Sequence, residues 1–267
     1  MKVRGYWRSI LVAALMSLIV GATSLAAQTA ELEGVARGFP ELRDSKGNKL
    51  ARGEFIQRVE NDRLHVKLRY DFNQGHYIEE YSVFRQRPRL VQESWSFHED
   101  RNGKLYREFQ VQFASGTAEA KKLEDGKVKK WSEKLKIDPG RTFAGFGFTL
   151  AVKAFHDRLI KGEAIKLQAV GFTPKPRAVS VEIYHPGIDN LRMADRVLRG
   201  DHFVIHPKIP WIVGLFMHVP DTHIWLTTPA PAAFLRSEGP LAEPKDSVVR
   251  IDLLPGGESD AARPPTK

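Results

Sequence analysis

The stretch RLHVKLRYDF, residues Arg63–Phe72, decides the fold of this chain, because apolar and polar residues alternate along its whole length. Five apolar side chains fall on one side: Leu64, Val66, Leu68, Tyr70 and Phe72. The residues between them are charged or are histidine. Such strict alternation is typical of a β-strand with one buried and one solvated face.

The same alternation recurs after Arg63–Phe72 at short intervals. The runs are separated by turn sequences at Asn73–Gly75, Arg87–Pro88, Asp100–Gly103 and Glu124–Gly126. Consecutive strands joined by tight turns form an antiparallel meander. Further strand-like runs follow later in the chain, at Ile165–Ala169, Val179–Ile183, Phe203–Ile205 and Thr222–Thr228.

The period changes after Pro139-Gly140, where apolar residues recur every three or four positions: Phe148, Val152, Phe155 and Leu159. This spacing predicts one amphipathic helix near residues 143–161, with Thr142 helping to cap its start and Gly162 ending it. The predicted fold class is therefore α+β and β-dominated. We expect a large curved antiparallel sheet, half-barrel-like, with one amphipathic helix packed on it. The alternative is two smaller β-domains with the helix near their junction.

The N-terminus has the composition of a secretory signal peptide over residues 1–26. Its basic start is followed by an apolar run from Ile10 to Ala22, and Ser24 and Ala26 stand at the −3 and −1 positions of a cleavage site. The prediction is a periplasmic or secreted protein after cleavage. We expect residues 27–50 to be an N-terminal lead-in, 51–254 a single β-rich domain and 255–267 a disordered tail.

The 267-residue chain contains no cysteine, which excludes disulfides, zinc–thiolate sites and thiol chemistry. Its net charge of +9 is spread among acidic residues, so nucleic acid is not an expected partner. A basic hairpin around Trp131 permits weak contact with an anionic envelope surface. Its lysines are Lys121, Lys122, Lys127, Lys129, Lys130, Lys134 and Lys136. The oligomeric state is left open.

Catalytic and metal motifs are weak. His202 and His206 would lie about 13 Å apart on a strand, too far for one zinc ion. We therefore expect no metal and no cofactor. Two-carboxylate glycosidase chemistry is considered for Glu79 and Glu93, in adjacent predicted strands, although solvated carboxylates balancing arginines are the favoured interpretation.

The string Phe143-Ala144-Gly145-Phe146-Gly147-Phe148 precedes the predicted helix. Its glycines suit an anion held at a helix N-terminus, but it lacks the lysine and spacing of a phosphate-binding loop. The favoured interpretation is that Gly145 and Gly147 let the helix start close against the sheet while the phenylalanines fill the core.

The order of signal, meander, helix and further strands resembles the periplasmic lipoprotein-localisation factors and related exported β-proteins of unassigned function. The segment Asp221–Thr227 resembles a late strand of the latter group. The resemblance implies a half-barrel that shelters an acyl chain under a helical lid. No functional residue of these families can be carried over.

The leading hypothesis is an exported, non-catalytic protein that binds an apolar or amphipathic ligand, such as lipid, between sheet and helix. The candidate ligand-binding residues are Phe148, Val152, Phe155, Leu159, Trp95 and Trp131. The alternatives are an envelope hydrolase acting on glycan or ester, and a structural or interaction protein of the envelope.

Overall fold

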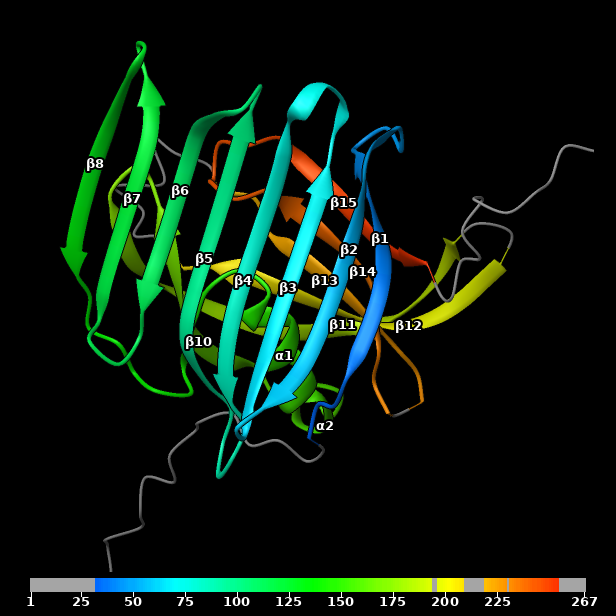
Figure 1. Cartoon of the computed structure of the whole chain (residues 1–267). Helices are drawn as coiled ribbons and strands as arrows, with labels where there is room; N and C mark the ends of the chain where they lie inside the picture. The colour runs from blue at the N-terminus through cyan, green and yellow to red at the C-terminus, as the bar shows by residue number, and fades with distance from the viewer. Residues whose placement is uncertain (1–31, 194–195, 209–218, 230, 255–267) are drawn as a thin grey trace, which may run out of the picture.

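A computed structural model describes residues 32–193, 196–208, 219–229 and 231–254. They form one 15-stranded sheet in the order β8-β7-β6-β5-β4-β3-β2-β1-β15-β14-β13-β12-β11-β10-β9 (Figure 1). The strands are β1 Ala36–Asp44, β2 Lys49–Glu60, β3 Arg63–Asp71, β4 Tyr77–Arg85, β5 Val91–Arg101, β6 Lys104–Gln112, β7 Thr117–Glu124, β8 Lys127–Lys134, β9 Thr142–Phe143, β10 Ile165–Phe172, β11 Pro176–Met193, β12 Arg196–Pro207, β13 Thr222–Thr227, β14 Phe234–Pro240 and β15 Val248–Leu254. The helical elements are a short 3₁₀ turn η1 Asn73–Gly75, α1 Gly147–Ala154 and α2 His156–Leu159.

The alternating runs form the predicted antiparallel meander, β2 to β8. In β3 the side chains of Leu64, Val66, Leu68 and Tyr70 are buried, and the intervening residues keep partial exposure. A period of two therefore places one whole set of side chains on the inner face of the sheet. The expected β-dominated class, with one large curved sheet, is confirmed.

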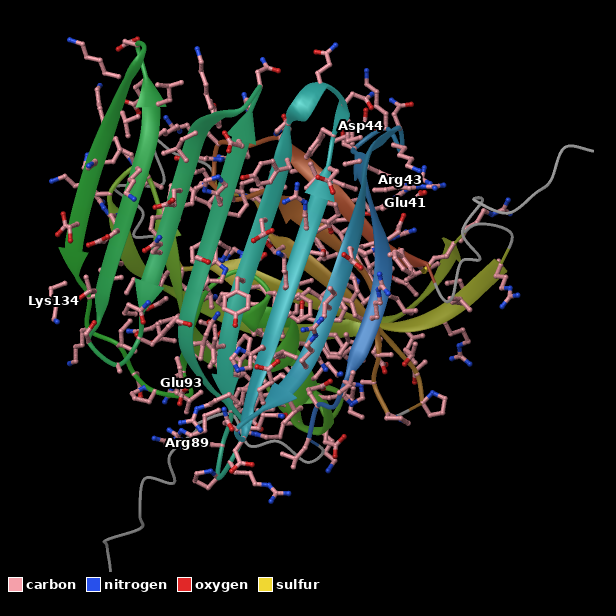
Figure 2. All side chains as sticks on the ribbon, viewed as in Figure 1. Glu41, Arg43, Asp44, Arg89, Glu93 and Lys134 are labelled. Atoms are coloured by element: carbon pink, nitrogen blue, oxygen red, sulfur yellow. The ribbon has the colours of Figure 1, made fainter. Side chains whose placement is uncertain are left out.

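Strand β1 lies inside the segment 27–50 that the sequence analysis treats as a lead-in. It is central in the sheet, paired with β2 on one side and with β15 on the other. Its alternation is hard to recognise because a charged residue is buried on the outer face. Glu41 is 6% exposed and forms ion pairs with Arg43 and Lys49. Figure 2 shows Glu41, Arg43 and Asp44 together near one end of β1. A turn follows Asp44, whose carboxylate and backbone are hydrogen-bonded to Asn48.

The sheet bends back on itself. The strands β10–β15 lie behind β1–β8 in Figure 1, and β7 and β8 contact β11. Every pairing is antiparallel except that of β9 with β10. At one edge, β8 presents exposed lysines, including Lys134 (Figure 2), which disfavours pairing with another chain.

The helical segment lies in the interior, between the two halves of the sheet (Figure 1). It is shorter than the predicted 143–161 and is divided at Phe155, whose ψ of 5° breaks the helix between α1 and α2. The prediction that Thr142 caps the helix is wrong: Phe146 is the N-cap, and Thr142 Oγ1 bonds Asp138 N and Gln168 Oε1 instead. Gly162 follows the helix with a φ of +87°, as predicted.

In the described part of the chain, no helix has both the length and the apolar character needed to cross a membrane. The predicted signal segment 1–26 and the predicted tail 255–267 lie outside the described residues.

Candidate ligand-binding cavity

A cavity of about 320 Å³ lies between the inner face of the sheet and the start of α1. Most of its wall is apolar, and aromatic rings from several strands and from the start of α1 contribute to it: Phe55, Trp95, Phe97, Phe146, Phe148, Phe172 and Phe234. This size and lining are typical of sites for small, largely apolar molecules. Among the described lining residues, none is lysine, arginine or histidine, and the only carboxylates are Glu80 and Glu243.

The loop that leads into α1 forms one side of the cavity and is held tightly on the sheet. Gln92 of β5 binds both backbone groups of Ala144, with Ala144 N donating to Oε1 over 2.8 Å and Nε2 donating to Ala144 O over 3.1 Å. Gly147 has no room for a side chain, because an added Cβ would lie 2.6 Å from Gln92 Oε1. At Gly145, whose φ is +50°, a Cβ would overlap Glu80 Oε1 and Trp95 Nε1. The interpretation that both glycines permit close packing is confirmed.

Glu80 is the acidic residue at this contact. Its Oε1 accepts hydrogen bonds from Trp95 Nε1 at 2.7 Å and from Phe146 N at 2.5 Å. Phe146 is the N-cap of α1, so the anion considered for this helix start is the protein's own carboxylate. Burial raises the pKa of Glu80 above its ordinary value, while the Phe146 and Trp95 hydrogen bonds oppose that rise. No described residue donates to Oε2.

Tyr70 is a second polar residue on the same face of the sheet, but it belongs to a core cluster and not to the described wall of the cavity. It is two positions along β3 from Leu68, the cross-strand partner of Glu80. Its ring is 2% exposed and its hydroxyl has no hydrogen-bond partner. Burial, with the nearby Glu80 charge, raises the pKa of Tyr70 well above its ordinary value.

The loop between β14 and β15 contributes Leu241, Ala242 and Glu243 to the cavity wall. It is fixed by Arg107 of β6, which is 2% exposed. The guanidinium donates to Glu99 Oε2 at 2.6 Å through Nε, and to Glu243 Oε2 at 2.8 Å through Nη1. Lys122 also pairs with Glu243, so this carboxylate is compensated by cations, in contrast to Glu80.

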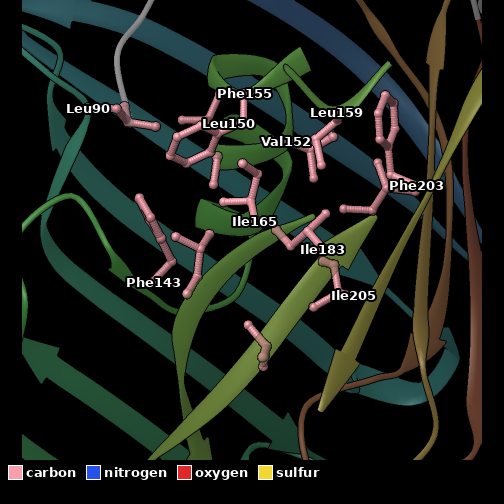
Figure 3. Packing of buried hydrophobic residues seen from close by; sticks show 14 of the residues in the cluster. Leu90, Phe143, Leu150, Val152, Phe155, Leu159, Ile165, Ile183, Phe203 and Ile205 are labelled. Carbon is pink, nitrogen blue, oxygen red and sulfur yellow. The ribbon is translucent and has the colours of Figure 1, made fainter. Parts of the chain in front are cut away.

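Beyond the cavity, the interior around the helical segment is filled. Val152, Phe155 and Leu159 are at most 2% exposed and belong to a core cluster with residues of β3, β10, β11 and β12. Figure 3 shows these three side chains facing Ile165, Ile183 and Phe203.

The predicted ligand-binding residues are thus divided between the cavity and the core. Phe148 and Trp95 line the cavity, whereas Val152, Phe155 and Leu159 are absent from its described wall. Trp131 of β8 is partly buried against a second core cluster and does not line the cavity either.

The structure does not bring Glu79 and Glu93 together. Glu79 lies opposite His98 in the β4–β5 register, and Glu93 is five residues further along β5, roughly 16 Å away at ~3.3 Å per residue. Each is paired with cations: Glu79 with Lys67 and Arg69, and Glu93 with Arg63 and Arg85. This agrees with the favoured interpretation of carboxylates balanced by basic residues.

The two histidines considered as ligands of one metal ion, His202 and His206, lie in separate hydrogen-bonded contacts. His202 Nε2 lies 2.9 Å from His223 Nδ1, and His206 Nδ1 lies 2.8 Å from Asp221 Oδ1. Burial lowers the pKa of His202, while Asp189 opposes this and His223 adds to it. No cluster of three potential ligands suited to a metal ion occurs within the described ranges.

Glu80 was passed over in favour of Glu79, although the sequence contains a signal for it. In β4 the residues Ile78, Glu80, Ser82 and Phe84 share the inner face, because Ile78, Ser82 and Phe84 are buried and alternate with it. A glutamate in register with buried apolar residues is itself an indication of a functional or specially bonded group.

No family model matches this sequence, and no curated protein is significantly similar to it. Among solved structures, one match is described as a "Beta-barrel-like Protein of Domain of Unknown Function DUF1849 from Brucella abortus". It is 10% identical, covers 83% of this chain and 96% of that chain, and superposes with a TM-score of 0.46. The relation to lipoprotein-localisation factors stays a prediction.

Proposed function

We propose that this chain is an exported, non-catalytic binding protein whose ligand is apolar or amphipathic, such as a lipid. The observation that carries the proposal is the cavity of about 320 Å³ with its mainly apolar wall. Burial of apolar surface provides roughly 25 cal/mol per Å², so a hydrocarbon chain placed in this wall gains affinity without specific polar contacts.

The surroundings of the cavity support a site that persists without its ligand. Gln92 fixes the loop before α1, and the buried Arg107 fixes the loop after β14. Both walls are therefore held by hydrogen bonds and ion pairs that do not depend on cavity contents. Preorganisation of this kind reduces the entropic cost of binding.

Export follows from the predicted signal peptide and is part of the proposal. Weak contact with an anionic envelope surface through the lysines of the β7–β8 hairpin is also proposed. Lys127, Lys129 and Lys130 are exposed there, on an edge of the sheet that solvent and other surfaces reach.

The test is a titration of the purified protein with N-phenyl-1-naphthylamine, a dye that fluoresces in apolar surroundings. The variant Ala169→Trp fills the cavity, because Ala169 lines it and packs against the adjacent core. Ala178→Trp is the matched control, since Ala178 is an exposed alanine on the neighbouring strand β11.

We expect the wild-type protein and Ala178→Trp to bind the dye with the same affinity, and Ala169→Trp to bind at least tenfold more weakly. Circular dichroism verifies that both variants are folded. Equal binding by all three proteins, or no binding by the wild type, would overturn the proposed function.

A further inference from the structure

Four histidines gather where three strands of the second half of the sheet meet the helical segment. They are His156 of α2, His185 of β11, His202 of β12 and His223 of β13, and they are called the histidine cluster below. His156 and His185 both lie against Asp201 of β12, whereas His202 contacts His223 directly. An imidazole ordinarily gains a proton near pH 6.5, so the charge of such a cluster changes under mild acidification.

The contact between His202 and His223 depends on a neutral ring. His202 Nε2 lies 2.9 Å from His223 Nδ1, and the two ring centroids are 5.2 Å apart. One of the two nitrogens must accept the hydrogen bond, but both nitrogens of a protonated imidazole are donors. Protonation of both rings therefore replaces a hydrogen bond between β12 and β13 by two N–H groups that face each other.

The charges around this pair stabilise one added proton better than two. Asp189 Oδ2 lies 3.2 Å from His202 Nδ1, on the side of the ring that faces away from His223. At 2.9 Å there is no space for a carboxylate between the two rings. The other charged residues beside the pair are on β14, where Glu238 is the register partner of His223 and Arg236 that of Trp225, which stacks on His202.

Asp201 is a single buried carboxylate that serves the other two histidines. It is 4% exposed, with Oδ2 3.2 Å from His156 Nε2 and Oδ1 3.3 Å from His185 Nε2. His185 Nε2 is buried without a hydrogen bond to any described residue, and Asp157, which lies 3.5 Å from His156 Nδ1, is exposed to solvent. One buried carboxylate compensates one imidazolium, so a second proton here leaves a buried positive charge.

The environment of His202 has the same sign of pH dependence. Burial lowers the pKa of His202, while Asp189 opposes this and His223 and His185 add to it. A base with a lower pKa in the folded state stabilises the fold above the pKa of the unfolded state. That stabilisation is lost as the pH falls through the unfolded and then the folded pKa. Acid therefore weakens the strand pairing around His202.

The strands that carry the histidine cluster also form part of the cavity wall. Val181 of β11, Ile205 of β12 and Ile224 of β13 line the cavity. His223 is next to Ile224 along β13, so its side chain is on the opposite face of the same strand. Strands that are pushed apart by charge on one face cannot keep the side chains of the other face packed around a ligand.

We propose that the histidine cluster makes ligand binding depend on pH. With neutral rings it holds β11, β12, β13 and α2 together beside the cavity, and its protonation below about pH 6 loosens this wall and releases the ligand. The inference rests on the proposed function, because it assigns the regulation of the same cavity. The protein then keeps its ligand at neutral pH and releases it in acidic surroundings.

The experiment is the titration with N-phenyl-1-naphthylamine, carried out at pH 7.5 and at pH 5.0. This diarylamine is uncharged at both pH values, so a change in its affinity reports on the protein. We expect the wild type to bind the dye at least tenfold more weakly at pH 5.0. Protonation of Glu80 does not produce such a loss, because it removes a charge from the wall around an apolar dye.

The double variant His185→Gln/His223→Gln discriminates, because a glutamine amide can donate to Asp201 and to His202 but does not titrate. Its affinity should fall by no more than about threefold between the two pH values. His98→Gln is the matched control, since His98 of β5 is outside the cluster and is paired with Asp100 and Glu108. It should keep the tenfold loss. His223→Gln alone, which changes only the directly bonded pair, should lose less affinity than the wild type.

Circular dichroism at pH 5.0 verifies that each protein is folded, and an unfolded wild type at this pH would overturn the inference. A wild-type loss of less than tenfold would overturn it too, and so would variants of His223 that lose as much affinity as His98→Gln. In each case dye binding at pH 7.5 would leave the proposed function intact. Absence of dye binding at pH 7.5 would instead contradict the proposed function.

Discussion

The two ends of the helical segment meet the same sheet in different ways. At its C-terminal end, Phe155 and Leu159 are packed to 2% exposure or less in a continuous core. At its N-terminal end, Phe146 and Phe148 are only partly buried, and both line a cavity of about 320 Å³. The interior of this protein is thus solid at one end of a short helix and hollow at the other.

The difference is explained by what holds each end. The C-terminal end is held by apolar packing, which is strongest when no space remains. The N-terminal end is held by polar contacts, through Gln92 and Glu80, that fix the backbone without requiring filled space around the side chains. A cavity can therefore persist next to a well-fixed helix start.

The largest expected effect is at the solid end. Phe155→Ala should lower the free energy of unfolding by about 3–5 kcal/mol, because it opens a void in a packed core. Phe148→Ala, at the hollow end, should cost only about 1–2 kcal/mol, since this side chain already borders empty space. Urea unfolding of both variants measures the contrast, and equal losses would contradict the division of the interior.

A similarly large loss of stability is expected at Arg107, which fixes the β14–β15 loop that forms part of the cavity wall. Arg107→Met leaves Glu99 and Glu243 buried with less compensation, at 0% and 3% exposure. Breaking a buried ion-pair network by removing one partner costs about 3–5 kcal/mol. Thermal and urea unfolding measure the loss. Arg101→Met, which removes an exposed partner of Glu99, is the control and should cost less than about 1 kcal/mol.

A smaller effect separates two glycines with positive φ on either side of the helical segment. Gly145→Ala should be destabilising by about 2–3 kcal/mol and should weaken dye binding, because its Cβ overlaps Glu80 and Trp95. At Gly162, where an added Cβ meets nothing within 4 Å, alanine should cost about 1 kcal/mol and leave dye binding unchanged. Parallel loss of dye binding in both variants would show that the contact with Glu80 is unimportant.

The smallest effect is a pH dependence at Glu80. Burial raises the pKa of Glu80 in the folded protein, so the folded protein holds the proton more strongly than the unfolded protein does. The contribution of Glu80 to stability therefore declines as the pH rises through the pKa of the unfolded state and then that of the folded state. Glutamine lacks this dependence. The free energy of unfolding of Glu80→Gln, minus that of the wild type, should therefore be larger at pH 7 than at pH 4. Urea unfolding at the two pH values measures this difference. A change in the opposite direction would show that hydrogen bonding outweighs burial.

Much of the architecture could be predicted from periodicity. The alternation of Leu64 to Tyr70 identified β3, and the spacing of Val152, Phe155 and Leu159 identified the buried side of the helical segment. Strand β1 was missed because ion pairs, not apolar side chains, cover its outer face at Glu41. A hydrophobicity pattern does not reveal a strand face that is buried by ion pairs.

The cavity could be predicted only in part. Phe148 and Trp95 were chosen as apolar residues and do line it. Whether a side chain borders a void or a neighbour depends on how strands distant in sequence pack, which a local pattern does not contain. Glu80 was missed as well: apolar residues occur on both faces of β4, and only the structure shows that Ile78 and Phe84, in register with Glu80, are the buried set.

The most direct test of the hollow end is a crystal of the protein soaked with 10-bromo-1-decanol and measured for anomalous scattering from bromine. We expect a bromine peak inside the cavity, with chain density along its apolar wall, and no peak among Val152, Phe155 and Leu159. Bromine found only on the molecular surface, or a cavity found filled by protein side chains, would contradict the account.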